Sequence, residues 1–555
     1  MRLIQAQKMS QSITLSTPDG SRIWLPGIVA CIARHLPDNE VACTLRMIDK
    51  TTSHQFEHHK TLRLSLPSPI HVFRERWGRP GAFRALSHKQ RLQVLCLTAA
   101  SGSVANLEVA LANAGLDLRC ELLEAAAAAG QLDMCKVLRA RGCLWADSLS
   151  VAAKAGYRHV CEWMLASGCP VTGDVVCSAA RGGREDLMQW LLTELQGRLV
   201  CWTFMKAAGE YLSLAALQRL WEQLTEGRHG SELQQQLEQF DEADRGYILA
   251  AAAGSTTPDW QAKVEWLEGL GYPRTATACD SAVRAGDGDA AVDRLQWLRG
   301  RGYPIDAAAA NAAVSVGNLA ALRFLVEQAG VRPSDDRQAE VAVHGGHLAV
   351  LQYLHASGFP VNTRLVAKEA ARKGHLPMVV WAVEDLGVAP GADSLLDCAA
   401  ESGNLELMTW LQGRGWALGP EAITKGAASG CEVALEWLVE RGCPFPLYGG
   451  AYLMAAHNGD LAMLRCLHRL GCPWEPPGEV LADCRWSLLN VCIDSGFSVA
   501  VLQCLLDSGF PEMDWDAAVK RAERTAHWVT RERHVALMAW LGEQRRRRSP
   551  GAQGA

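Results

Sequence analysis

The sequence lacks the marks of several protein classes. No stretch approaches the run of roughly eighteen apolar residues that a membrane-spanning helix needs, and the opening MRLIQAQKMSQSITLSTPDG has no sustained apolar core of the secretory type. The motifs of phosphate loops, serine hydrolases and zinc hydrolases (G-x-x-x-x-G-K-S/T, G-x-S-x-G and H-E-x-x-H) are absent. These absences predict a chain of the cytoplasm or nucleus with no membrane span, no enzymatic activity and no cofactor.

An excess of charge of one sign is also missing. The chain has 55 Lys and Arg residues against 60 Asp and Glu residues, for a formal net charge of −5. Proteins that bind nucleic acid usually carry a basic excess, so we expect no nucleic acid among the partners. The short basic run Arg545–Arg548 indicates an import signal or a solubilising tail.

Metal-ligand spacings are missing as well. None of the 19 cysteines forms a C-x-x-C pair. Several of them recur in register after a glycine, among them Cys143, Cys169, Cys443 and Cys472. This predicts small buried side chains in a reducing compartment rather than a disulfide framework. His54 and His58, four residues apart, would share a helix face, but no third ligand stands at a recognisable spacing from them or from Glu57 and His59. We therefore predict no metal site.

What the chain does contain is a repeat. Phe and Tyr are scarce, whereas Trp is common at 19 residues, and part of these recur in a phrase of the L-x-W-L type, mostly at steps of roughly 26 to 31 residues. The aromatic series is Trp163, Trp190, Trp266, Trp297, Phe324, Tyr353, Trp381, Trp410 and Trp437, and other residues fill the same slot at Val137, Arg219, Cys466, Cys504 and Trp540. A period of this length predicts about fourteen stacked units rather than a globule.

Each unit reads as two helices joined by a tight turn. An Ala pair, two variable residues and a Gly are followed by apolar residues at spacings of three and four, as in AAESGNLELMTWLQGRG from Ala399. The Gly after the Ala pair suits the end of a first helix, and Gly358 or Gly442 suits the end of a second. We expect an all-α solenoid in which the small residues let helices approach and the Trp column is buried between units.

This pattern resembles the ankyrin repeat, especially over Ala342–Gly358 and Ala399–Gly415. The resemblance covers residues 94–543, with insertions near 222–246 and 474–490, although the T-P-L-H opening is missing and the period is shorter than 33 residues. Other two-helix repeats, such as tetratricopeptide units, are the alternative. In ankyrin repeats the two variable residues line the concave face, which implies a partner-binding surface made by Lys154, Arg181, Ser315, His344, Arg372, Lys373, Glu401, Ser402, His457 and Asn458.

Residues 23–59 predict three short helices. They resemble an F-box, the module that docks on the Skp1-type adaptor of cullin ubiquitin ligases, and the matching adaptor-binding positions are Leu25, Pro26, Ile28, Val29, Ile32 and Leu36. The alternative is a cap whose apolar side chains are buried against the first repeat. Residues 1–22 are expected to be disordered, 60–93 to be a linker and 544–555 to be a basic disordered tail.

Together these observations predict a scaffold that binds a protein partner, whose identity the sequence does not reveal. Two alternatives stay open. The first is an F-box-type substrate receptor of a cullin ubiquitin ligase. The second is a hydrolase related to sphingomyelin phosphodiesterase, with which short-repeat ankyrin chains are sometimes grouped, although no catalytic motif supports it.

Overall fold

The computed structural model describes residues 26–195, 202–226, 239–334, 337–390, 394–446, 449–474, 488–509, 515–524 and 531–548. Over these residues the chain is helical and has no β-strand. It divides into two compact units, one made of residues up to 83 together with 90–148, and the other made of residues 84–89 together with 149 onward. The fold is a helical repeat, as the sequence predicts.

The first unit opens with a small helical bundle. Its helices are α1 (Pro26–Ala33), α2 (Asp38–Cys43) and α3 (Lys50–Gln55), with a short 3-10 turn at Leu45–Met47. Val29, Val41, Leu45 and Phe56 form its buried core. The three predicted helices are therefore present, and they have a core of their own.

The segment after this bundle is more ordered than a linker. α4 (Ile70–Trp77) lies within it, and α5 (His88–Ala100) begins before the expected start of the repeats. Asn39 is fully buried and its amide donates to the carbonyls of Arg63, Leu66 and Pro67 at 2.8, 3.1 and 3.1 Å, while its own oxygen accepts from the N–H of Arg63. One asparagine thus holds an irregular segment in place by satisfying its backbone groups.

From α5 onward the helices alternate as first and second helices of successive repeats. The first unit contains the pairs α5 with α6 (Val104–Ala114) and α7 (Cys120–Ala128) with α8 (Leu132–Ala140). The number of repeats, about fourteen from the sequence, stays a prediction, because several connections lie outside the described residues.

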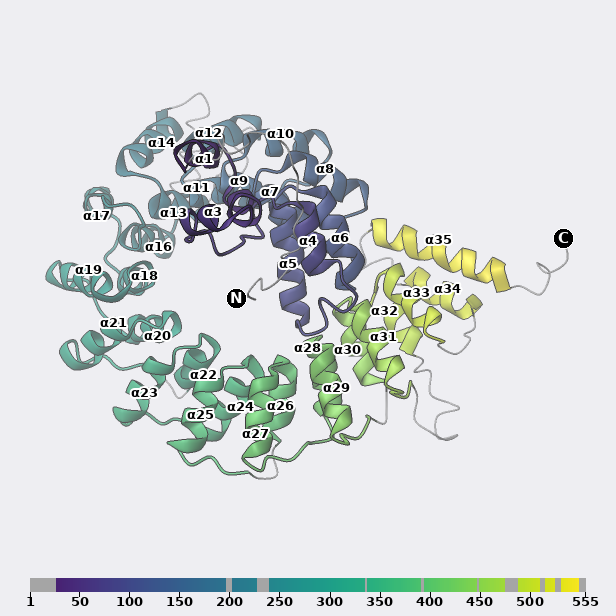
Figure 1. Cartoon of the computed structure of the whole chain (residues 1–555). Coiled ribbons are helices and arrows are strands. Elements are labelled where there is room, and N and C mark those ends of the chain that lie inside the picture. The colour runs from purple at the N-terminus through teal and green to yellow at the C-terminus, as the bar shows by residue number, and fades with distance from the viewer. Residues whose placement is uncertain are drawn as a thin grey trace. The chain divides into compact units, whose positions relative to one another are not determined.

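The second unit continues the same alternation (Figure 1). Its pairs are α9 (Ser148–Ala155) and α10 (Arg158–Ala166), α11 (Asp174–Arg181) and α12 (Glu185–Glu194), α13 (Trp202–Tyr211) and α14 (Leu214–Glu226), α16 (Glu242–Ala253) and α17 (Trp260–Gly269), α18 (Thr277–Ala285) and α19 (Gly288–Gly300), α20 (Ala307–Val316) and α21 (Leu319–Arg323, continued by a π-helical turn to Gln328), α22 (Arg337–His344) and α23 (Leu348–Ala356), α24 (Thr363–Lys373) and α25 (Leu376–Glu384), α26 (Leu395–Ser402) and α27 (Leu405–Gly413), α28 (Ala422–Ser429) and α29 (Glu432–Glu440), α30 (Gly450–His457) and α31 (Leu461–Arg469), α32 (Leu488–Asp494) and α33 (Val499–Asp507), and α34 (Trp515–Arg524) and α35 (Arg531–Arg548).

First helices form one layer of this row and second helices the other. Each first helix from α11 to α34 packs on the next first helix, and from α11 to α30 these contacts are more extensive than those between the corresponding second helices. In Figure 1 the first helices α16, α18 and α20 lie on the inner side of the row, and α17 and α19 on the outer side. The Ala pairs explain the close layer, since Ala370, Ala371, Ala399 and Ala400 are fully buried and leave little side-chain volume between helices.

Glycine makes the closest approach between two first helices. A Cβ built on Gly182, at the end of α11, would lie 1.8 Å from the backbone carbonyl oxygen of Lys154 in α9. The predicted glycine ends are also confirmed, because Gly374 and Gly442 both have φ of 75°, in the left-handed region.

The Trp column matches the prediction only in part. Trp163, Trp190, Trp410 and Trp437 lie in equivalent second helices but are half-buried, whereas Phe324 and Trp381 of the same series are buried. In α27 the fully buried residues are Leu407, Met408 and Leu411. Trp410 directly precedes Leu411, so its side chain lies at the edge of the buried face of the helix. The exposed part of several rings is covered by an arginine four residues later, with Arg301, Arg414 and Arg441 lying 4.8, 4.9 and 4.0 Å from the centroids of Trp297, Trp410 and Trp437.

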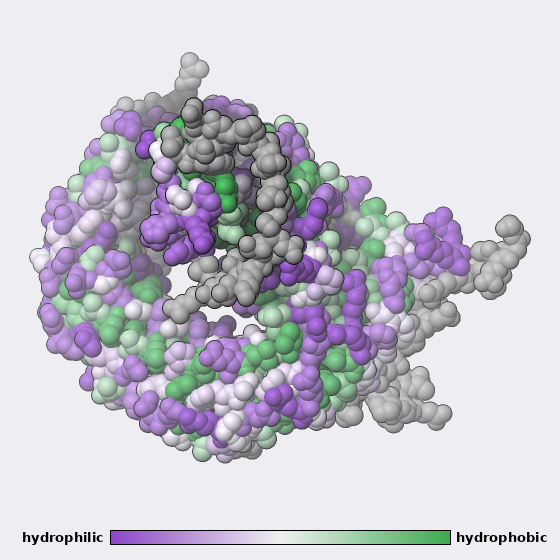
Figure 2. All heavy atoms as spheres, viewed as in Figure 1, coloured by the Kyte–Doolittle hydropathy of each residue, from purple (hydrophilic) through white to green (hydrophobic). Residues whose placement is uncertain are grey.

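Other boundaries also need correction. Helix α35 continues to Arg548, so the basic run is helical where a disordered tail was expected from 544. Both insertions lie partly outside the described residues, and residues 1–22 and Leu25 lie wholly outside them. No helix in the described part of the chain is long and apolar enough to span a membrane. The face seen in Figure 2 carries hydrophilic and hydrophobic residues interspersed.

Candidate partner-binding surface

The residues predicted to line the concave face all lie at the ends of first helices. They stand in or just after the last turn of α9, α11, α20, α22, α24, α26 and α30, and their side chains are exposed or half-buried: Lys154, Arg181, Ser315, His344, Arg372, Lys373, Glu401, Ser402, His457 and Asn458. They therefore occupy equivalent places along one layer, because each follows its Ala pair in the same register.

Three successive first helices bring some of these residues together. Glu369 of α24, whose side chain is 12% exposed, lies 3.5 Å from His344 of α22 and 3.3 Å from Arg372 of its own helix. Arg372 in turn lies 3.5 Å from Glu401 of α26. Charges of alternating sign thus connect neighbouring repeats along the layer, and in solvent such exposed pairs contribute at most about 1 kcal/mol each to stability.

Three of the other predicted residues make contacts within their own repeat or with the preceding one. Arg181 pairs with Asp174 of the same helix at 2.8 Å, and Ser315 accepts from Arg284 of the preceding first helix at 3.1 Å. The amide of Asn458 donates to the carbonyl of Ala428 at 2.9 Å. The predicted residues thus form a row along the layer rather than one compact site.

A pocket opens beside the central part of this row. It has a volume of about 480 Å³ and is lined by residues of α24, α26 and α28 and by the loop 416–420 that leads into α28. Its charged lining residues are Lys368, Arg372, Asp397, Glu421 and Lys425. Arg372 is the one charged lining residue that the sequence predicts to bind a partner.

The missed residues carry a sequence signal nevertheless. Lys368 and Asp397 stand four positions before Arg372 and Glu401, one helical turn earlier on the same face. Lys425 holds the same position relative to the residue after the next Ala pair. A search one turn before each variable pair would have found this second row of polar side chains.

The loop wall of the pocket is held by Asp397. This side chain is 5% exposed and accepts from the N–H of Gly419 at 2.8 Å and from the hydroxyl of Ser394 at 2.8 Å. A Cβ on Gly419 would lie 2.1 Å from the Asp397 Oδ2 atom, so only glycine permits this approach. The Asp397 Oδ1 atom therefore serves to fix the loop, because it accepts both of these hydrogen bonds.

The cations around the pocket also act on Cys398. Burial raises the pKa of this thiol, and the nearby Lys425, Arg372 and Lys368 oppose the rise by favouring the thiolate. Burial disfavours the charged form of Lys425, but the bond to Glu421 and the neighbouring Asp397 outweigh burial and raise the Lys425 pKa. Lys425 is thus cationic at neutral pH.

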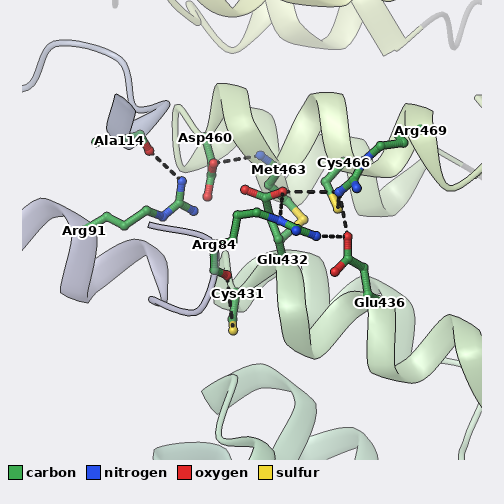
Figure 3. Close-up of polar contacts among 10 residues, drawn as sticks. All are labelled: Arg84, Arg91, Ala114, Cys431, Glu432, Glu436, Asp460, Met463, Cys466 and Arg469. Atoms are coloured by element: carbon green, nitrogen blue, oxygen red, sulfur yellow. Dashed lines mark hydrogen bonds and ion pairs between the residues drawn. The ribbon is translucent and has the colours of Figure 1, made fainter. Parts of the chain in front are cut away.

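A second polar cluster joins segment 84–89 to α29 and α31 (Figure 3). Arg84 lies 3.5 Å from Glu432 and also pairs with Glu436, and Arg469 lies 3.3 and 2.7 Å from the same two carboxylates. Together with Cys466, the two glutamates are close enough to hold a metal ion. Two guanidinium groups already balance the two carboxylates, and burial raises the pKa of Cys466 to about 12, so the cluster is built as an ion-pair anchor.

The histidines have structural surroundings. His54 is exposed in α3, which ends at Gln55, so His58 does not share a helix face with it, contrary to the sequence prediction. The Nε2 atom of His347 lies 3.2 Å from the carbonyl oxygen of Ser315, as expected for a histidine that bonds neighbouring backbone. Burial lowers the pKa of His375, which favours its neutral form.

The F-box-like positions divide into two groups. Pro26, Ile28 and Ile32 are exposed on α1, with Ile28 at 43% and Ile32 at 36%, and Leu36 is half-buried. Val29 is fully buried in the bundle core and so does not belong to an adaptor-binding surface. Met47 and Ile48, on the turn before α3, add further exposed apolar side chains.

Comparisons with known proteins show only that the chain resembles solved helical-repeat structures. No protein-family model and no curated protein matches the chain. Among solved structures, the pentatricopeptide repeat protein PPR10 from maize matches with 14% identity and a TM-score of 0.20, covering 93% of this chain and 92% of that chain. The same protein in complex with an 18-nt psaJ RNA element matches with 12% identity and a TM-score of 0.23, covering 93% of this chain and 90% of that one.

The expectation that excludes nucleic acid is therefore wrong. It rested on the balanced net charge, yet the solved helical-repeat chains that match include one in complex with RNA. Net charge is a poor guide for an elongated repeat, because a ligand meets the local charge of one layer rather than the sum over the chain. The low scores assign no ligand to this chain.

Proposed function

We propose that the chain is a non-enzymatic scaffold that holds a protein partner on its first-helix layer. The observation that carries this proposal is the row of polar side chains at equivalent ends of consecutive first helices, laid over a fixed Ala packing layer. A stacked repeat offers a long continuous surface of this kind, whose specificity lies in the variable positions.

Affinity capture with paired variants tests the proposal. Changing Lys154 and Lys373 to Glu alters the first-helix layer at two distant places, whereas changing Lys136 and Arg414 to Glu alters second helices. We expect the first pair to lose a partner that the wild-type chain and the second pair both retain, with capture unchanged after ribonuclease treatment. Equal loss in both variants, or a partner that disappears with ribonuclease, would contradict the proposal.

The finer assignment of the repeats as ankyrin-type belongs to the same proposal. It is supported by the AAxxG turns and by second helices of nine residues such as α27 and α29. A designed chain in which an ankyrin consensus unit replaces residues 399–426 tests it. The hybrid should keep the helix content and thermal unfolding of the parent, and collapse of the neighbouring repeats would refute the assignment.

A second candidate function rests on the exposed face of the amino-terminal bundle. Ile28, Ile32, Met47 and Ile48 are exposed while the bundle has its own core, which favours a docking surface over a cap buried against the repeats. We infer that this face binds a Skp1-type adaptor, so that the chain would present a substrate for ubiquitin transfer without chemistry of its own.

This second candidate has a direct test. Changing Ile28 and Ile32 to Asp places charges on the exposed face and should abolish co-purification of the adaptor while the bundle stays folded. Val29→Asp is the contrasting variant, because it should unfold the bundle by burying a charge in its core. An adaptor that never co-purifies with the wild-type chain, while other F-box proteins bring it down, would end this candidate.

A further inference from the structure

We propose that the pocket between α24, α26 and α28 binds the carboxylate of an acidic peptide, as the anchoring point of the partner on the first-helix layer. This inference rests on the proposed scaffold function and names the chemistry that the layer would recognise. Three features of the pocket support it: the basic side chains of its lining, the loop that a buried carboxylate holds in place, and the indole N–H of Trp416, which has no acceptor among the described residues.

The pocket lining has a surplus of cations. It contains three basic side chains, Lys368, Arg372 and Lys425, against two carboxylates, and one of these, Asp397, is buried and accepts from the loop. The side chain of Arg372 is 43% exposed, whereas the carboxylates that it pairs with, Glu369 and Glu401, are 12% and 35% exposed. Lys425 keeps 27% of its side chain exposed, against 68% for its partner Glu421, which precedes α28. An incoming anionic group would balance the surplus, with Arg372 as the most accessible cation of the described pairs.

The wall of the pocket contains an unused donor. Trp416 lines it and is 4% exposed, yet its indole Nε1–H finds no acceptor among the described residues. A buried N–H without a partner costs about 1–3 kcal/mol. This nitrogen is inaccessible in the structure, so a ligand acceptor would recover that loss only after the Trp416 ring turns toward the pocket. A carboxylate has enough lone pairs to accept from this N–H and from a lysine or arginine at the same time.

The remaining lining favours a peptide over RNA. Ala417 and Pro420 are exposed beside the cations and Leu418 is half-buried, which provides an apolar shelf for a residue next to the acid. Recognition of single-stranded RNA usually requires exposed aromatic rings on which bases stack, and the one aromatic ring of this pocket, Trp416, is buried. The volume of about 480 Å³ suits one or two side chains.

The loop is held in its shape before any ligand arrives. The Gly419 N–H to Asp397 bond fixes one side of it, and the hydroxyl of Ser394 lies 3.1 Å from the carbonyl oxygen of Ala417 on the other. A pocket formed in this way loses little entropy on binding, which strengthens the affinity obtained from a few charged contacts.

The test is direct binding by the purified full-length chain. Fluorescein-labelled hexapeptide pools with one position fixed as Asp or Glu are compared, by fluorescence polarisation, with pools in which that position is Asn or Gln. We expect at least tenfold tighter binding of the acidic pools, weakening as salt is raised because the charges are partly exposed. The double variant Lys368→Met with Lys425→Met should remove the preference, and Trp416→Phe should reduce it several-fold.

The control variant is Lys136→Met, on the second helix α8 and not among the lining residues, and it should keep the preference. Circular dichroism confirms that each variant is folded. Equal binding of acidic and amide pools, a preference that survives in the double variant, or polyuridine RNA bound in a Lys425-dependent way while the peptides are not, would each overturn the inference.

These outcomes are distinct from failure of the scaffold proposal. If capture depends on Lys154 and Lys373 but the peptide pools show no acid preference, the scaffold stands and the pocket inference fails. If capture does not depend on the first-helix layer, the scaffold proposal fails, and the binding measured with purified chain still decides the chemistry of the pocket.

Discussion

Lys263 offers the sharpest test of how the repeats are held together. This residue of α17 is fully buried, and its ammonium group donates to the carbonyls of Gly209 and Leu212 at 2.9 and 2.8 Å and to the hydroxyl of Ser255 at 2.5 Å. The ammonium group comes from the next repeat and satisfies carbonyls at the C-terminal end of α13. These carbonyls have no N–H partner within their own helix. Burial lowers its pKa to about 8.

The change Lys263→Met keeps much of the volume and removes the donors. Two backbone carbonyls and a hydroxyl then lose a partner, at about 1–3 kcal/mol for each buried group left unsatisfied. Removal of a buried cation offsets part of this loss, since a pKa depressed by about 2.5 units corresponds to about 3 kcal/mol. We expect a net local destabilisation on the order of 2 kcal/mol at pH 7.

The pH dependence has a definite sign. Since the folded pKa of Lys263 lies below its unfolded value of about 10.5, the unfolded state binds more protons between pH 8 and pH 10.5, and stability rises with pH in that window. From pH 7 to pH 9 the wild-type chain should gain about 1 kcal/mol that the variant lacks. The difference between the two proteins therefore widens as pH rises.

Hydrogen–deuterium exchange, read by mass spectrometry, measures the difference in local stability between the two proteins in peptides covering α13 and α17. Rates are corrected for the intrinsic effect of pH, and Lys154→Met, at an exposed position, serves as the control with no pH-dependent difference. Unchanged protection of α13 in Lys263→Met, or a difference from wild type that shrinks between pH 7 and pH 9, would refute the reasoning.

Three further outcomes are expected. Gly182→Ala should lower the free energy of unfolding by roughly 3 kcal/mol or more, because the added Cβ would lie 1.8 Å from the Lys154 backbone. Gly442→Ala has open space around it and should lower the free energy of unfolding by only about 1 kcal/mol, because of its φ of 75°. Thermal unfolding compares the two variants. Asn39→Ala should cost roughly 2–4 kcal/mol and make the segment after α3 sensitive to protease, and an unchanged cleavage pattern would count against it. The buried Cys143, Cys443 and Cys472 should resist iodoacetamide at pH 8 until the chain unfolds, since burial raises their pKa values, whereas the exposed Cys31 should react in the native protein.

Much of the architecture could be predicted from the sequence, because repeats of this kind are built from local contacts. The Ala pairs, the glycine at the end of each helix and the three-and-four spacing of apolar residues all act within a few residues, so the helix pairs follow from them. The same register correctly placed Arg372 and Glu401 on one layer, and the burial of Cys143, Cys169, Cys443 and Cys472 was correctly read from the glycine that precedes each.

The tertiary structure decided the features that depend on residues far apart in the chain. Arg84 pairs with Glu436 across 352 positions, and no local pattern indicates such a contact. The half-burial of the Trp column depends on how much of each indole the neighbouring helix covers, which the repeat period does not fix. The pocket around Trp416 exists only because three first helices and one loop meet, held by a buried carboxylate that accepts a backbone N–H 22 positions away. Local propensity determines which helices form, whereas burial and hydrogen-bond satisfaction between helices determine where a surface is left open for a partner.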